Sequence, residues 1–414
     1  MKRNKTKVTA FLSAAFIVAF GLILSCCRQE KTRTDELLAE KFGRQEARYT
    51  EQKGEGGLKK TTLSLDTTLI SKPSGPGSFI RLEHLPPVEQ GNTGTCWAHA
   101  AMSLLESELK RQGHTPVKLS EMYIVYWEYL EKARRFIREK GASFLGQGSE
   151  AGLALARAAQ YGLVRESDYN GLKPGQSGHD HSQLFREFSS FLESLKKSDD
   201  WDETRGLARI KDILSRHLGP PPGRIEFEGS SITPLEYMHE ILKLNPDDYV
   251  SFMSFMYVPF YSRGEFKVPD NWPHDPGYFN LPLHEFGLTL LRALRRGYTA
   301  VLSIDFSEPG YVPENDLAIV PSFDIPRNFI DQSSRELRFA NNTTTDDHAV
   351  HCVGYTDTAG ENWFLVKDSW ENAWYGKHPG LFFYRDDYIK LKCLMFTVHK
   401  SGAPEILAKF GPGE

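Results

Sequence analysis

The segment Gln90-Gly-Asn-Thr-Gly-Thr-Cys96-Trp97 constrains this chain most, because it places a cysteine where a glycine-rich loop meets a helix. From Ala98 to Leu109, apolar residues recur at helical spacing, so Cys96 is predicted to lie at the helix N-terminus. Unpaired backbone N–H groups and the positive end of the helix dipole stabilise a thiolate there. The Gln90 amide is predicted to face the same point and, with the Cys96 N–H, to stabilise an oxyanion. The alternative interpretation of Cys96 is a buried core thiol.

A second group of polar residues lies far along the chain, at the ends of two predicted strands. β-Branched and aromatic residues at 348–355 and 363–367 indicate these strands. His348 opens the first strand and Asp368 follows the second, so antiparallel pairing would bring the imidazole and the carboxylate together. A thiol, a base and a group that orients the base are the parts of nucleophilic catalysis. Their joint occurrence favours chemistry over a core thiol and a structural histidine.

These residues resemble the motifs of the papain-like cysteine peptidases. The pattern Gln-Gly-x-x-Gly-x-Cys-Trp is similar to the family's nucleophile motif, in which Gln90 matches the oxyanion-hole glutamine and Cys96 the nucleophile. His348 matches the family histidine, and Asp368-Ser-Trp370 resembles the family's Asn-Ser-Trp block. The resemblance implies that Asp368 orients His348 and that Trp370 shields their bond from water and contacts substrate.

The chain departs from the papain pattern at four positions. Asp368 stands where the family usually has asparagine, and Glu371 and Tyr375 stand where it has glycines. Thr93 replaces a cysteine that the commoner papain branch uses in a disulfide. Asp368 therefore brings a negative charge to a position that is usually neutral.

A closer resemblance is to the bleomycin hydrolase and bacterial aminopeptidase C branch. The segment from Leu119 to Arg134 is similar to that branch's second helix, and Gln147-Gly148 with the residues up to Gly162 is similar to its Gly-Gly turn and third helix. Gln147 and Gly148 are therefore expected to pair with an extended substrate. The separation of Cys96 from His348 far exceeds the roughly 130–150 residues of the simple papain pattern, which requires an insertion.

The resemblance implies an α+β, two-lobed papain-like fold with a helical lobe, a β-barrel-like lobe and a helical insertion. The peptidase domain is predicted at 77–414, with the insertion at about 172–275. Periodicity predicts further elements along the domain. Helices are expected at 97–111, 119–140, 149–161, 182–197, 204–218 and 282–296, and a strand at 299–306.

The N-terminus predicts export. A basic start, an apolar stretch from Val8 to Leu24 and a small residue before Cys26 describe a secretory signal over residues 1–25. The sequence Ile23-Leu-Ser-Cys26 resembles a bacterial lipobox, which implies lipidation of Cys26 and a membrane-anchored lipoprotein on the periplasmic or cell-surface face. An uncleaved signal anchor is the alternative. Residues 26–76 are polar and glycine-rich, which predicts a disordered tether.

Composition limits the partners. A formal net charge of −4 argues against nucleic acid, and 40% hydrophobic residues indicate a globular domain. Peptide or protein substrates are implied, with no metal or organic cofactor required. The pair His179-Asp-His181 has the form of a metal site, but its Gly/Ser-rich surroundings favour a solvated loop and helix cap.

The sequence thus predicts a lipid-anchored cysteine peptidase, with three alternatives. These are a Cys-His-Asp amidase acting on cell-wall peptides, a catalytically silent peptide-binding lipoprotein and a transglutaminase-like acyl transferase. The resembled branch places a C-terminal arm in the cleft, which enforces aminopeptidase action. Here Ala403–Phe410 resembles the helix before that arm and the sequence stops at Glu414. We therefore expect an open cleft and internal cleavage.

Overall fold

The computed structural model describes residues 46–53 and 59–411. Residues Met1–Ile70 and Pro321–Phe329 form one compact unit, and Ser71–Val320 with Ile330–Glu414 form a second. The predicted signal segment and Cys26 lie outside the described residues.

The described part of the first unit contains a β-hairpin. Strands β1 (Ala47–Lys53) and β2 (Lys59–Leu65) pair antiparallel, with Tyr49 opposite Leu63. The structure therefore differs from the predicted disordered tether over these residues. Two threonine-containing strands satisfy each other's backbone groups without a buried apolar face, so the absence of apolar periodicity did not exclude them.

The second unit is built around a mixed sheet. Among the described residues it has 11 strands in the order β10-β11-β14-β13-β12-β9-β15-β6-β8-β7, with β3 pairing to β12. Most neighbours are antiparallel, whereas β11 with β14 and β6 with β8 are parallel. The strands are β3 (Ile80–Arg81), β6 (Tyr249–Met253), β7 (Arg263–Gly264), β8 (Tyr278–Asn280), β9 (Ala300–Ile304), β10 (Tyr311–Val312), β11 (Leu317–Ala318), β12 (His348–Thr358), β13 (Glu361–Lys367), β14 (Leu381–Arg385) and β15 (Cys393–His399).

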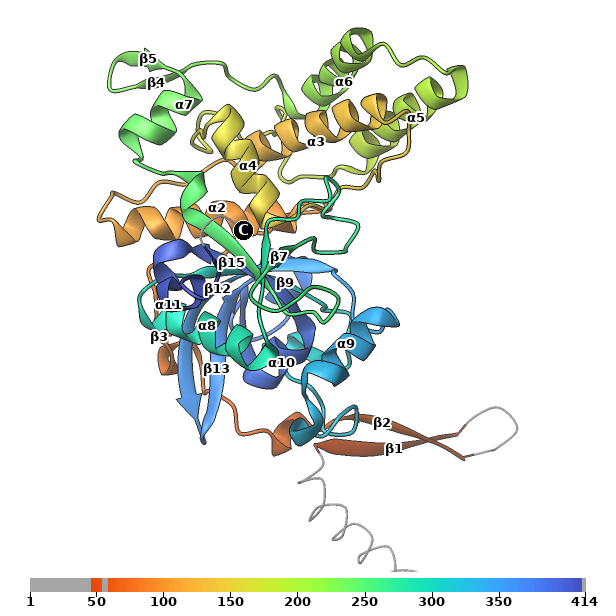
Figure 1. Cartoon of the computed structure of the whole chain (residues 1–414), viewed down its shortest axis with the longest axis vertical. Helices are drawn as coiled ribbons and strands as arrows, with labels where there is room; N and C mark the ends of the chain where they lie inside the picture. The colour runs from red at the N-terminus through yellow and green to blue at the C-terminus, as the bar shows by residue number, and fades with distance from the viewer. Residues whose placement is uncertain (1–45, 54–58, 412–414) are drawn as a thin grey trace, which may run out of the picture. The chain divides into compact units, whose positions relative to one another are not determined.

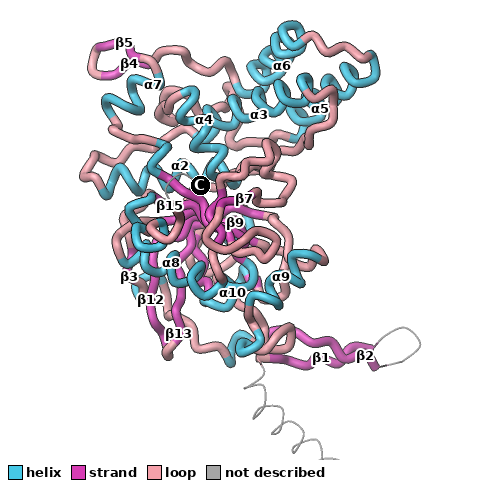
Figure 2. The backbone as a smooth tube through the Cα atoms, in the orientation of Figure 1, coloured by secondary structure: helices cyan, strands magenta, loops and turns pink. Residues whose placement is uncertain are grey.

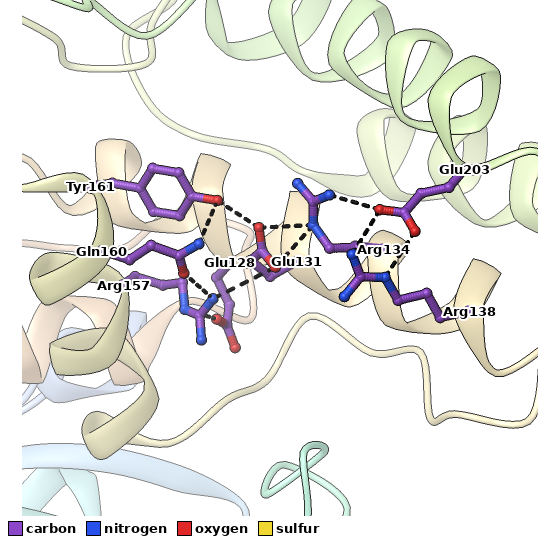
Figure 3. A network of polar contacts seen from close by, with 8 residues as sticks. All are labelled: Glu128, Glu131, Arg134, Arg138, Arg157, Gln160, Tyr161 and Glu203. Carbon is purple, nitrogen blue, oxygen red and sulfur yellow. Dashed lines mark hydrogen bonds and ion pairs between the residues drawn. The ribbon is translucent and has the colours of Figure 1, made fainter.

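Helices of the same unit gather at one end of the sheet, as the cyan and magenta segments of Figure 2 show. Ion pairs join two of them: Glu203 at the start of α6 lies 2.8 Å from both Arg134 and Arg138 of α3 (Figure 3). The helices of this group are α2 (Cys96–Arg111), α3 (Glu121–Arg138), α4 (Ala151–Tyr161), α5 (Ser182–Ser198), α6 (Glu203–Leu218) and α7 (Pro234–Glu236). The sheet carries α8 (Leu283–Arg295), α9 (Gln332–Ala340), α10 (Asp386–Lys392) and α11 (Pro404–Leu407).

Helix α2 lies between the helical part and the sheet (Figure 1). Its alanines and leucines are buried almost all round, which lets α3 and α4 pack on one side and β12 and β9 on the other. Ala349 of β12 and Val301 of β9 belong to the same apolar core as α2. The first residue of α2 and the first residue of β12 are thereby held on two packed elements.

The periodicity-based helices and the strand at 299–306 correspond to α2–α6, α8 and β9. The predicted insertion at 172–275 differs from a helical one in its second half. After α5 and α6 the chain forms a small hairpin, β4 (Ile225–Phe227) with β5 (Ser230–Ile232), and then contributes β6 and β7 to the sheet. Short two- to five-residue strands leave too little alternation to be recognised in the sequence.

Within the described ranges, every helix is too short or too polar to cross a bilayer.

Candidate active site

Cys96 is the first residue of α2 and remains partly accessible although the helix behind it is buried. The loop before it is held by its own side chains: the Thr93 hydroxyl donates to the Gln90 carbonyl at 3.0 Å and contacts the Thr95 hydroxyl at 2.6 Å. The Trp97 indole N–H donates to Gly94 O at 3.1 Å. These bonds fix the sulfur at the positive end of a 16-residue helix, as the sequence predicts.

His348 opens β12 and is almost completely buried. Its Nε2 lies 2.7 Å from Oδ1 of Asp368, and its side chain also hydrogen-bonds to Cys96, which leaves Nδ1 for the thiol. The Phe306 ring covers the imidazole at a centroid distance of 5.2 Å. Burial lowers the pKa of His348, but Asp368 and the Cys96 thiolate outweigh burial and raise this pKa to about 10. The arrangement favours an imidazolium beside a thiolate.

Asp368 directly follows β13 and accepts three hydrogen bonds. Besides His348, the backbone N–H of Trp370 donates to Oδ1 at 2.9 Å and the Tyr311 hydroxyl donates to Oδ2 at 3.1 Å. Burial raises the pKa of Asp368, yet His348 and these donors bring it below its usual range. The carboxylate therefore stays charged in an interior position.

Tyr311 is part of this site although no motif in the sequence marks it. It lies on β10, the edge strand, and its ring stacks on Phe382 at 4.6 Å. Burial, followed by the nearby Asp368, raises the pKa of Tyr311 well above its ordinary value, so the hydroxyl keeps its proton and remains a donor.

Gln90 is fixed by the segment that carries Asp368. The Ser369 hydroxyl donates to Gln90 Oε1 at 2.7 Å, and the Gln90 backbone N–H donates to Ser369 O at 2.8 Å. The Gln90 amide nitrogen donates to Thr93 O at 2.6 Å. An amide nitrogen carries two hydrogens, so this bond uses one of them. The ring orientation of His348 and the amide orientation of Gln90 thus depend on one short segment.

Gln147 and Gly148 form a wall beside the nucleophile loop. Gln147 Oε1 accepts from Gly94 N at 2.9 Å, and the Gln147 carbonyl accepts from the Trp97 indole at 3.1 Å. A Cβ at Gly148 would lie 2.0 Å from the Asp270 carboxylate, so only glycine fits. The two oxygen atoms of Gln147 are engaged in holding the loop. Because Gly148 has no side chain, nothing of its own covers its backbone. Trp370 is partly exposed.

The surroundings of residues 179–181 differ from the expected solvated loop. His181 is buried and its Nδ1 lies 3.3 Å from the Tyr129 hydroxyl, so the pair is not a solvated loop. Asn92 N donates to His179 O at 2.9 Å, and His181 N donates to Asn92 O at 3.1 Å. Gly91 approaches this backbone so closely that a Cβ would meet His179 O at 2.4 Å. The segment supports the nucleophile loop, and no cluster that could hold a metal occurs among the residues with described positions.

Comparison with known proteins places this geometry in a family. Residues 334–390, which include His348 and Asp368, match the papain family cysteine protease model. No curated protein matches the chain.

Two solved structures are similar to the chain. PepW from Lactobacillus rhamnosis HN001 shares 18% sequence identity at a TM-score of 0.63, covering 83% of this chain and 85% of its own. Digestive procathepsin L 3 of Tenebrio molitor larval midgut shares 15% identity at a TM-score of 0.35, covering 79% of this chain and 71% of its own. The likeness to PepW shows a shared α+β papain-like fold with a helical part and a large mixed sheet. The chain thus has a papain-like fold, and the segment that carries His348 and Asp368 matches the papain family of cysteine proteases.

Proposed function

We propose that this peptidase hydrolyses peptide bonds through a thioester on Cys96, with His348 as acid and base and Asp368 as the residue that orients His348. The observation that carries the proposal is the buried His348 side chain, bonded to Asp368 at 2.7 Å on one edge and to the Cys96 thiol on the other. Peptides are the substrates that the family implies.

The proposed reaction begins with attack of the Cys96 thiolate on the scissile carbonyl carbon. The oxyanion that forms is stabilised by the Cys96 backbone N–H and by the second N–H of the Gln90 amide. His348 then gives its proton to the leaving amine as the C–N bond breaks. Neutral His348 next removes a proton from water, which attacks the thioester, and the C–S bond breaks to restore the thiolate and the imidazolium.

The charge on Asp368 distinguishes this site from the usual asparagine arrangement. A neutral amide orients the imidazole, whereas a carboxylate also favours its protonated form. Tyr311 and the Trp370 N–H keep the carboxylate ionised, which the lowered pKa of Asp368 reflects. We propose that this charge strengthens the thiolate–imidazolium pair.

We further propose that the chain belongs to the bleomycin hydrolase and aminopeptidase C branch. The resemblance of residues 119–162 to that branch's pattern and the fold shared with PepW support this proposal. Gln147, Gly148 and Trp370 are proposed to contact substrate.

We propose that Cys26 carries a lipid that anchors the exported peptidase to a bacterial membrane. Fatty-acid labelling of the full chain in a bacterial host should mark the wild type and the Cys27→Ser control, and Cys26→Ser should lose the label. An unlabelled wild type, or an equally labelled Cys26→Ser variant, would show that the lipobox resemblance is misleading.

The peptidase activity is tested by analysing the products of one unstructured polypeptide. The wild type should cleave it, and Cys96→Ala should slow cleavage by at least roughly 10,000-fold, because the nucleophile is lost. Cys352→Ala, which changes a fully buried thiol, is the matched control and should keep activity. Internal fragments indicate endopeptidase action and single released N-terminal residues indicate aminopeptidase action. Full hydrolysis by Cys96→Ala, or cleavage of peptidoglycan fragments alone, contradicts the proposal.

The role of Asp368 is tested by the pH dependence of kcat/KM. In Asp368→Asn the imidazole stays oriented but loses a favourable charge, so the His348 pKa falls from about 10. The imidazolium is then lost at lower pH, and the alkaline limb should move down by about one pH unit while substantial activity remains. Asp368→Ala frees the ring and should cost roughly 100-fold or more. An unchanged alkaline limb in Asp368→Asn would mean that the carboxylate is not coupled to His348.

A further inference from the structure

Two carboxyl groups that the proposed mechanism does not use meet beside the active site. Glu150 is the residue before α4, and Asp346 lies two residues before His348. Their side chains hydrogen-bond to each other, so one comes from the helical part and the other from the sheet. The Ser303 hydroxyl of β9 donates to Glu150 Oε2 at 2.9 Å. Glu150 Oε1 is buried and has no N–H or hydroxyl donor among the described residues.

Both carboxyl groups of the pair have raised pKa values. Burial raises the pKa of Glu150 to about 7, with Asp270 adding to the effect. Burial and then the neighbouring Glu150 raise the pKa of Asp346 well above its ordinary value, with smaller contributions from Asp270 and the Cys96 thiolate. Two adjacent carboxyl groups in a low-dielectric site cannot both ionise unless a cation joins them. The pair therefore holds a proton or attracts a positive group.

The charge of Lys132 lowers the pKa of Glu150 and of Asp270, but the hydrogen bonds of the neighbouring cations go to other groups. Lys132 donates to the carbonyls of Gly146 and Gly148. Arg157 lies 3.3 Å from Glu128 and turns towards Gln160 and Glu131 (Figure 3). Neither forms an ion pair with Glu150 or Asp346 within the described part of the chain.

Asp346 is the more exposed member of the pair. Asp346 and Asp270 are partly exposed residues, as are Gly148 and Cys96, whereas Glu150 is buried. Tyr278 lies beside Glu150 and Asp346 and also lines a hollow of about 340 Å³ between α4 and strands β6 and β8.

Resting on the proposed peptidase function, we propose that Glu150 and Asp346, flanked by Asp270, form a subsite for a positively charged nitrogen of the substrate on the acyl side of the scissile bond. His348 passes its proton to the leaving amine near the Ser369–Trp370 segment. Glu150 instead follows the Gln147–Gly148 wall, which we propose to pair with the acyl half. A bound ammonium or guanidinium displaces the shared proton and satisfies Glu150 Oε1 by a charge-assisted hydrogen bond.

The charged nitrogen has two sources: an arginine or lysine side chain, or the free N-terminal amine of a short acyl half. Both are tested with the full chain on four fluorogenic peptides. Arginine or its neutral isostere citrulline occupies the second residue before the scissile bond, and each peptide is made with a free and with an acetylated N-terminus. The wild type should prefer either arginine over citrulline or the free amine over the acetylated one by about 10-fold or more in kcat/KM.

Glu150→Gln and Asp346→Asn keep the shape of each group but remove its charge, so each should bring that preference close to one while the acetylated citrulline peptide is still cleaved. Asp347→Asn, the same change at the exposed neighbouring carboxylate, is the matched control and should keep the preference. Equal cleavage of all four peptides by the wild type, or an unaltered preference in both variants, overturns the subsite. Failure to cleave any of the four peptides instead counts against the proposed function itself.

Discussion

The hydrogen bond between His348 and Asp368 is the interaction on which the rest of the site depends. It is buried and 2.7 Å long, and it fixes both the ring orientation and the protonation of the imidazole. The same carboxylate accepts hydrogen bonds from the Tyr311 hydroxyl of β10 and from the backbone N–H of Trp370. The next residue, Ser369, donates a hydrogen bond to Gln90. A change at Asp368 is therefore transmitted to both the base and the proposed oxyanion hole. Because the carboxylate is charged, it also biases the thiol–imidazole pair towards its ionic form.

That bond is useful only if α2 and β12 keep their alignment, since the sulfur lies on one and the imidazole on the other. Ala349 and Val301 belong to the same apolar core as α2 and help to hold this alignment. A buried polar network adds direction: the Ser103 hydroxyl lies 2.7 Å from His351 Nδ1 and accepts from Lys367 Nζ at 2.8 Å. Burial lowers the pKa of Lys367 to about 8, and this lysine immediately precedes Asp368. The network thus joins α2 to the strand that presents the orienting carboxylate.

Local patterns in the sequence predicted the elements that carry chemistry. A glycine-rich loop before a helix located Cys96, and strand ends located His348 and Asp368, because each signal lies within a few residues of the functional group. Tyr311 and the Glu150–Asp346 pair were not predicted, since they become neighbours of the site only through pairing of strands and helices far apart in the chain. The hairpin at 47–65 and strand β6 were missed for a related reason. Their stability comes from partner strands, and their own sequences show little apolar alternation.

Activation of Cys96 by His348 should set its reactivity apart from that of the other described cysteines. Mass spectrometry can map the rates at which a peptidyl epoxide alkylates Cys96, Cys352 and Cys393. Burial raises the pKa of Cys352 and Cys393, so Cys96 should react more than about 100-fold faster than either, and His348→Ala should slow the alkylation of Cys96 itself by a similar factor. Comparable alkylation of all three thiols, or an unchanged rate of Cys96 alkylation in His348→Ala, would contradict activation of Cys96 by His348.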